Sequence, residues 1–362
     1  MLLRRTDLEK HERENFAPFA TFADAATREF PDEPDEFRTE FQRDLARIIH
    51  SKAFRRLKGK TQVFVAHWGD HFRNRLTHSL EVAQISRSLA RNLGVNENLS
   101  EAIALAHDLG HTPFGHAGEE RLNSLLQKFG QSFEHNRQSR RILQILEKKY
   151  PGFDGLNLTF DLLDGLAKHA TIYDLPEKID SQPSIEAQIV NLADEIAYTN
   201  HDLEDGLRAK IFTRADLKNL QLWQKALQKV DAKLAAEPFI HRAVSAIIDL
   251  LDRDLLENSA QNLAKNKIQS LAEVQNFGRS LVEFSPQIQT ELGELRDFLK
   301  KNFYLSSSVE KLSKNGADTL EKIFTAILGN QKLLPAEFAK RLQSDPPEIV
   351  VADFVAGMTD NF

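Results

Sequence analysis

The sequence lacks cysteine, and this absence narrows the metal sites that the chain can form. Its 362 residues include no Cys, which excludes disulfides, iron–sulfur clusters and zinc sites built on thiolates. A bound metal must therefore be held by His and carboxylate side chains. Long apolar segments are missing too, because no run reaches the roughly 18 residues that a transmembrane helix needs. The first residues turn charged at once, unlike a signal peptide, so we expect a cytoplasmic protein with no membrane partner.

An excess of basic charge is also missing. The formal net charge is -6, so no overall positive field would attract nucleic acid, although single-strand binding at a subunit interface stays an open alternative. The shares of hydrophobic (41%) and charged (28%) residues are those of an ordinary globular protein. At roughly 150 residues per domain, the length allows one large or two modest domains.

Apolar residues recur at helical spacing along most of the chain. The pattern predicts helices over residues 41–57, over 75–93 with Gly94 as the stop, and over 184–208. Ser100 is predicted to cap the next helix, which ends at Gly110. After residue 214 helix follows helix, with polar breaks near 236–238, 285–286 and 314–316. The β-branched and aromatic stretch over 60–68 predicts a short strand or an extended loop. We therefore expect an all-α protein with an N-terminal arm (1–40), a catalytic core (41–210) and a helical C-terminal region packed on that core (211–362).

Histidine is scarce, yet it clusters. Of 12 His residues, seven lie between residues 67 and 135. A single His is usually a surface residue or a satisfied core residue. His107 and Asp108, however, follow the apolar run AIALA and so stand at the end of a buried helix, where both groups are costly to bury without a partner. A metal ion would satisfy both. The seven clustered histidines between residues 67 and 135 are His67, His71, His78, His107, His111, His116 and His135.

Two more side chains complete a ligand set. His78 and Asp194 both lie in apolar helical surroundings. With His107 and Asp108 they offer two nitrogens and two carboxylates, which suits Mn²⁺ or Mg²⁺ first, and also Co²⁺, Ni²⁺, Fe²⁺ or Zn²⁺. A closed tetrahedral zinc site fits less well, because catalysis needs open coordination positions.

The order His, His-Asp, Asp is the signature of the HD phosphohydrolase superfamily, and longer blocks resemble its dGTPase-like branch. This resemblance spans nearly the whole chain. It implies an HD-domain helical core with a helical C-terminal extension, and metal-dependent hydrolysis of deoxynucleoside triphosphates (dNTPs) to deoxynucleoside and tripolyphosphate. The blocks are RTEFQRDLARIIHSKAFRRLKGKTQVF (38–64), RNRLTHSLEVAQI (73–85), AHDLGHTPFGHAGEE (106–120), FEHNRQS (133–139), NLADEIAYTNHDLEDG (191–206) and the tail VADFVAGMTDNF.

The resemblance also implies catalytic roles. His116 and Glu119 match the family's catalytic pair, and their spacing of three makes them neighbours on one helical turn, so that Glu119 can orient the imidazole. His135 matches a second histidine near the scissile phosphate, and His111 matches a position that contacts phosphate. Which His donates the proton stays open.

The same resemblance implies substrate contacts. Gln62 matches a residue at the base and sugar, Arg75 a phosphate contact and Lys168 a triphosphate contact. Tyr198 and Asp202 follow Asp194 at helical spacing and share one helical face with it. In the family this Tyr packs where a 2′-hydroxyl would lie, and this Asp accepts a hydrogen bond from the 3′-hydroxyl.

One departure concerns assembly. Relatives form tetramers or hexamers, and some are activated by a dNTP at a second, interfacial site. Many carry a His shortly after a Tyr in the C-terminal half, where this chain has Leu305 and Ser306 after Tyr304. This difference puts subunit contacts or regulation in doubt. Two alternatives stay open: an HD enzyme that acts on another nucleotide, as a nucleotidase or phosphodiesterase, and a nucleotide-sensing regulator.

Overall fold

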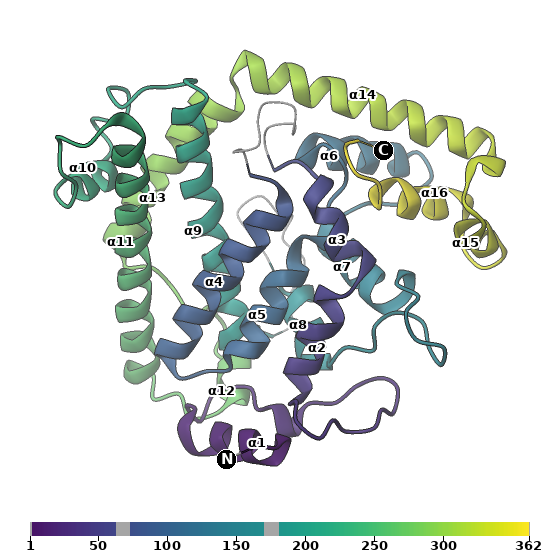
Figure 1. Cartoon of the computed structure of the whole chain (residues 1–362), viewed down its shortest axis with the longest axis horizontal. Coiled ribbons are helices and arrows are strands. Elements are labelled where there is room, and N and C mark those ends of the chain that lie inside the picture. Colours follow the sequence, from purple (N-terminus) through teal and green to yellow (C-terminus); the bar gives the residue numbers. More distant parts are fainter. Residues whose placement is uncertain (1, 63–72, 170–180, 362) are drawn as a thin grey trace. The chain divides into compact units, whose positions relative to one another are not determined.

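A computed structural model of the chain describes residues 2–62, 73–169 and 181–361. His67, His71 and most of the predicted strand or loop over 60–68 lie outside the described residues. Among those described, β pairing is limited to three isolated bridges, so the all-α prediction is confirmed. The α-helices (Figure 1) are α1 (Arg5–Asn15), α2 (Glu40–Ile49), α3 (Lys52–Arg56), α4 (Arg75–Leu93), α5 (Glu97–Ala106), α6 (Gly115–Gln127), α7 (His135–Arg141), α8 (Phe160–Ala167), α9 (Ile185–Arg208), α10 (Gln221–Leu227), α11 (Ala236–Lys265), α12 (Leu271–Gln275), α13 (Pro286–Leu299), α14 (Ser307–Gly329), α15 (Ala336–Ala339) and α16 (Pro347–Ala356).

Short helical turns join these helices. The 3₁₀ turns include η2 (Leu57–Gly59) and η4 (His107–Gly110), and η6 (Lys300–Tyr304) is a π-helical turn. The chain divides into two compact units, each described by itself below. The first unit comprises residues 1–46, 80–105 and 159–306, and the second comprises residues 47–79, 106–158 and 307–362. The predicted boundaries at residues 40 and 210 stay predictions.

The first unit is organised around α9. Nearly every residue of this helix is buried, and α11 runs beside it (Figure 1). Ser184 caps α9, because its hydroxyl accepts a hydrogen bond from the Ala187 amide. The buried Glu186 carboxylate accepts hydrogen bonds from the backbone amides of Thr21 (2.8 Å) and Asn96 (3.1 Å). These bonds attach the N-terminal segment and the turn before α5 to the first turn of α9.

In the second unit α14 lies along α6 and α16 (Figure 1). The core between them contains Leu122, Leu126, Phe324, Val351 and Val355. Burial of large side chains such as these contributes about 1.5–3 kcal/mol each. The C-terminal tail is thus packed into the core of this unit.

Four local predictions can be judged. The stop at Gly94 (φ 70°) and the break near 285–286, where Ser285 caps α13, are confirmed. The predicted break near 314–316 is wrong, since α14 continues through it. Gly316 serves close packing there, because a Cβ atom on it would lie 2.6 Å from Cγ of Phe114. The break near 236–238 is displaced, since α11 already begins at Ala236.

The start of α5 and the helix over 41–57 also differ from prediction. The α5 helix begins at Glu97, so Ser100 lies inside it, and the Asn96 side chain accepts the amides of Asn98 and Leu99 at the true start. Residues 41–57 form two helices, because Ser51 ends the first pattern by capping α3 through the Phe54 amide. Among the described residues, no helix is both long and apolar enough to cross a bilayer.

Candidate active site

Three of the predicted metal ligands converge in the second unit. His78 lies on the first turn of α4, and His107 and Asp108 lie on η4. All three are buried. The Nε2 atoms of His78 and His107 lie 3.8 and 3.4 Å from the Asp108 carboxylate oxygens. One nitrogen or oxygen of each residue lies within 4.8 Å of the others. This arrangement fits a divalent metal ion held by imidazole and carboxylate.

The charge of Asp108 also fits a metal ligand. Burial alone would raise the pKa of this carboxyl, but the charges of Arg75, His107 and His111 hold it well below its usual range. The Arg75 guanidinium donates a hydrogen bond of 2.9 Å to Asp108 Oδ2. Asp108 is therefore ionised at neutral pH, as metal binding requires. Arg75, predicted as a phosphate contact, has this second partner in the structure.

The His-Asp turn is attached to α7 by short contacts. The Gly110 amide donates to Ser139 Oγ at 2.8 Å, and that hydroxyl donates to the His107 carbonyl at 2.8 Å. A Cβ atom on Gly110 would lie 2.1 Å from the His135 carbonyl oxygen, so only glycine allows this approach. Ser139 lies in the block FEHNRQS but was given no role from the sequence.

The four predicted catalytic residues also lie together in the second unit. The Glu119 carboxylate accepts a hydrogen bond from the His135 amide (2.8 Å) and lies 3.0 Å from His135 Nδ1. Its second oxygen lies 3.4 Å from His111 Nδ1. The rings of His111 and His135 stack with centroids 3.9 Å apart, and His116 meets His111 edge-on at 5.7 Å. Glu119 thus contacts the imidazoles of His135 and His111, in addition to the pairing with His116 that the sequence predicts.

Neighbouring charges and burial give Glu119 and His116 different protonation states. Burial opposes ionisation of Glu119, yet hydrogen bonds to His111 and His135 hold its pKa below the usual range. The His116 side chain is exposed, but the surrounding protein atoms and the charges of His111 and Arg75 lower its pKa to about 4. At neutral pH the cluster therefore combines an ionised Glu119 with a neutral His116.

Gln62 lies next to the start of α4 and the start of α6. Thr61 and Asn74 form an isolated antiparallel bridge, and the Arg75 amide donates to the Lys60 carbonyl at 3.1 Å. Gly115 has φ of 59°, and a Cβ atom there would lie 3.4 Å from the Gln62 carbonyl oxygen. In this unit the structure thus brings the Gln62 backbone close to the segment that leads to His116.

The remaining predicted residues lie in the first unit. Asp194, Tyr198 and Asp202 are buried on α9. His169 Nε2 lies 3.7 Å from Asp194 Oδ2, and the Tyr304 hydroxyl donates a short hydrogen bond to Asp202 Oδ2. The membership of Asp194 in the metal set stays a prediction.

Lys168 forms hydrogen bonds with nearby side chains. The sequence patterns did not predict two residues that contact α9, His169 and Tyr304. Lys168 Nζ donates to Asp164 Oδ2 (2.8 Å) and Ser181 Oγ (2.9 Å). His169 was not singled out, although it adjoins Lys168. Tyr304 was noted only for the residues that follow it. No spacing in the sequence connects His169 or Tyr304 to α9, because their contacts are long-range.

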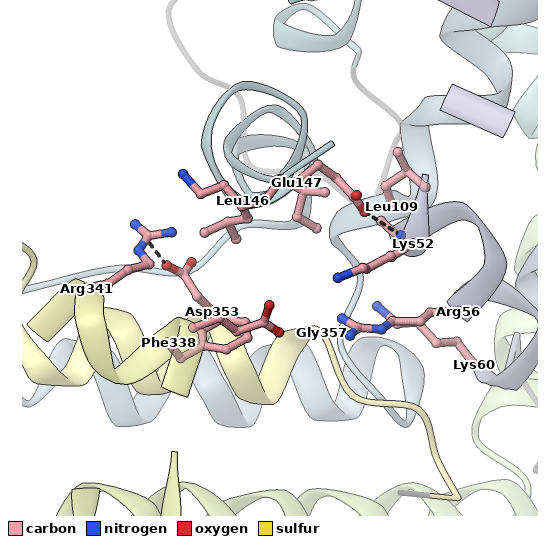
Figure 2. Close-up of a pocket in the computed structure, with 14 residues that line it drawn as sticks. Lys52, Arg56, Lys60, Leu109, Leu146, Glu147, Phe338, Arg341, Asp353 and Gly357 are labelled. Carbon is pink, nitrogen blue, oxygen red and sulfur yellow. Dashed lines mark hydrogen bonds and ion pairs between the residues drawn. The ribbon is translucent and has the colours of Figure 1, made fainter. Parts of the chain in front are cut away.

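A separate cavity in the second unit is lined by both charged and apolar side chains. Lys52, Arg56 and Lys60 face Arg341, which is paired with Asp353 (Figure 2). None of the described residues that line it belongs to the predicted metal, catalytic or substrate-binding set. The residues predicted to carry the chemistry therefore lie outside this cavity.

Comparisons with known proteins identify the family of the chain. Residues 75–199 match the HD domain family, and residues 282–362 match the phosphohydrolase-associated domain. A "Deoxyguanosinetriphosphate triphosphohydrolase-like protein" of Geobacter metallireducens is 44% identical over 97% of this chain and 94% of its own length. Proteins of the same name from Geobacter sulfurreducens (45%; 91% and 88%) and Leptospira interrogans serovar Lai (40%; 100% and 98%) are also similar. The chain therefore belongs to the HD-domain, dGTPase-like family of phosphohydrolases.

Proposed function

We propose that this phosphohydrolase cleaves dNTPs into deoxynucleoside and tripolyphosphate with the help of a divalent metal ion, Mn²⁺ or Mg²⁺ first among the candidates. The observation that carries the proposal is the buried group of His78, His107 and Asp108 in the same unit as the Glu119–His135–His111 cluster. The names of the relatives support the substrate class.

His78, His107 and Asp108 would hold the metal, and Asp194 is proposed as the further ligand. A bound divalent ion polarises a phosphate oxygen and lowers the pKa of water. Arg75 and His111 are proposed to bind phosphate oxygens. Neutral His116 can accept a hydrogen bond from the attacking water, because its pKa of about 4 keeps it unprotonated at neutral pH.

The leaving group needs a proton. Water attacks the α-phosphorus, the bond from phosphorus to the 5′ oxygen breaks, and an alkoxide is a poor leaving group. We propose that His135 donates this proton. Ionised Glu119, 3.0 Å from Nδ1 of His135, would orient the ring and favour its protonated form. The role of Glu119 is comparable to that of the carboxylate in a catalytic triad.

The sugar would be selected by α9. Tyr198 is proposed to occupy the space of a 2′-hydroxyl and Asp202 to accept from the 3′-hydroxyl, with the Tyr304 hydroxyl holding Asp202. Gln62 and Lys168 are proposed to contact the base and sugar and the triphosphate. A homo-oligomer (tetramer or hexamer), a dNTP activator and single-strand binding rest on the resemblance alone and stay predictions.

The test is product analysis with metal add-back. Metal-free protein would receive Mn²⁺, Mg²⁺ or Co²⁺ with each dNTP alone and with all four mixed, because an activator site shows only in the mixture. We expect deoxynucleoside and tripolyphosphate from the parent protein and from Asp345→Asn, a control whose carboxylate pairs with Arg141 and Arg341. Monophosphate with pyrophosphate, or no turnover with any mixture, would contradict the proposal.

A further inference from the structure

Three segments of the second unit meet at one junction. Residues 59–62 follow α3 and carry Gln62. Residues 111–114 precede α6 and carry His111. Residues 356–360 comprise the end of α16 and the tail after it, and carry no residue with a predicted role. Two side chains, Asp360 and Lys60, make hydrogen bonds that join the three segments.

Asp360 joins the other two segments through its carboxylate. Oδ1 accepts a hydrogen bond from the Phe114 amide at 3.0 Å. Oδ2 accepts from the Thr61 amide at 2.8 Å and, at short range, from the Thr61 hydroxyl. The Asp360 amide in turn donates to the Gly59 carbonyl at 3.0 Å. One side chain thus holds the residue before Gln62 and the residue before Gly115.

Lys60 makes the reciprocal connection. Its buried amino group donates to the Ala356 carbonyl at 2.9 Å and, at short range, to the His111 carbonyl. A buried polar group is costly unless it is hydrogen-bonded, so these two carbonyls fix its position. Lys60 and Gly357 also border the basic cavity, next to Arg56 (Figure 2).

The loop before α6 contains a strained backbone position that neighbouring contacts must stabilise. Phe114 has φ of 64°, which is a costly conformation for a bulky residue. Its amide is held by Asp360, and its ring packs on Gly316. A strained backbone persists only where its surroundings determine it. The position of His111 and of the first turn of α6 therefore depends on contacts with the end of the chain.

We propose that Asp360 and Lys60 are positioning residues, through which the C-terminal segment holds Gln62 and the 111–116 loop in their working arrangement. The effect on turnover rests on the proposed function, but the effect on loop order does not. Asp360→Asn is the sharpest variant, because it keeps the shape of the side chain. Its single acceptor oxygen can serve Thr61 or Phe114, but not both.

The first arm of the test measures amide hydrogen exchange in the metal-free parent and in Asp360→Asn. We expect exchange at Thr61 and Phe114 to accelerate by about tenfold or more, while α9 stays as protected as in the parent. Asp345→Asn, which removes a carboxylate from the same region, should leave both amides unchanged. Unchanged exchange at Thr61 and Phe114 in folded Asp360→Asn would overturn the proposal, whatever the enzyme hydrolyses.

The second arm measures kinetics. Asp360→Asn should lower kcat/KM by roughly 10–100-fold, as loss of a group that orients catalytic residues does. In a double-mutant cycle its effect should be non-additive with that of Gln62→Ala, since both act through one segment. Additive effects on kcat/KM would contradict a positioning role. So would an equal fall in kcat/KM in Asp345→Asn when the two variants have the same Tm.

Thr61→Val is the milder companion, because it removes only the hydroxyl donor and should act in the same direction with a smaller effect on kcat/KM. It keeps the test decisive if Asp360→Asn folds poorly. If the parent protein hydrolyses no dNTP, the proposed function fails, and the exchange arm alone decides the role of Asp360.

Discussion

The histidine cluster of the second unit and the α9 face of the first unit acquire their functional groups in different ways. In the cluster, His107, Asp108, Glu119 and His135 lie close in sequence and satisfy one another's charges. On α9, Asp194 lies near His169, which precedes the helix, and Asp202 accepts a hydrogen bond from Tyr304, which is 102 residues away in the sequence. The cluster is thus a local design that the sequence displays, whereas the surroundings of α9 depend on the tertiary fold. The predictions below test this contrast.

The largest effect is expected at Asp108. Asp108→Asn removes an ionised ligand and the partner of Arg75. Turnover should fall by roughly 10³-fold, equivalent to about 4 kcal/mol of transition-state stabilisation. Titration calorimetry with Mn²⁺ should show weakened binding, and circular dichroism should show an intact fold. Full activity with unchanged Mn²⁺ affinity would remove Asp108 from the metal site.

The next effect concerns proton transfer. Glu119→Gln should lower kcat by about 10²–10⁴-fold, the range for loss of general acid–base catalysis. The pKa of Glu119 is held low by His111 and His135, so in the parent it stays ionised across the working pH range. The variant should therefore lose rate at every pH between 6 and 9. A loss confined to one end of that profile would assign Glu119 a titrating role.

Tyr304→Phe tests the α9 side of the comparison. It removes the hydroxyl that donates to Asp202. A hydrogen bond to a charged group contributes about 1.5–3 kcal/mol, so KM for the dNTP should rise by roughly tenfold or more with little change in kcat. Tyr150→Phe makes the same chemical change in the second unit and should leave KM unaltered. Equal KM values for both variants would mean that Asp202 does not need Tyr304.

The smallest effect is one of stability, on the helix α11 that packs beside α9. Burial, with a contribution from Asp249, raises the pKa of Asp252 on α11 to about 7. The folded state therefore binds a proton that the unfolded state releases, and this contribution to stability is lost as pH rises from about 4 to 7. At pH 8, Asp252→Asn should raise Tm by about 2 °C, and at pH 4 the gain should vanish. A variant that is equally stabilised at both pH values would contradict the shift.

The same contrast explains what could be predicted from the sequence. The α9 helix was predicted within a residue at each end, because its apolar residues recur at helical spacing throughout. His107 and Asp108 could be predicted as ligands because buried polar groups at a helix end need partners, and His78 because it lies in apolar helical surroundings. The predicted break near 314–316 is wrong because Gly316 lies inside a helix, where the absence of a Cβ atom allows the Phe114 ring to pack closely.

Contacts between residues far apart in the chain could not be predicted from local sequence patterns. His169 and Tyr304 reach α9 from distant segments, and Asp360 reaches Thr61 and Phe114 from the end of the chain. None of these contacts has a periodicity or a spacing that a single sequence displays. The long-range contacts of the site are therefore the part that only the structure supplies.

Hydrolysis in ¹⁸O-labelled water tests the central claim most directly. The products of each dNTP would be separated and their oxygen isotopes measured by mass spectrometry, with Mn²⁺ as the added metal. Attack of water at the α-phosphorus predicts one ¹⁸O atom in tripolyphosphate and none in the deoxynucleoside. Label in the 5′-hydroxyl, or in orthophosphate or pyrophosphate released from the triphosphate, would contradict the proposed reaction.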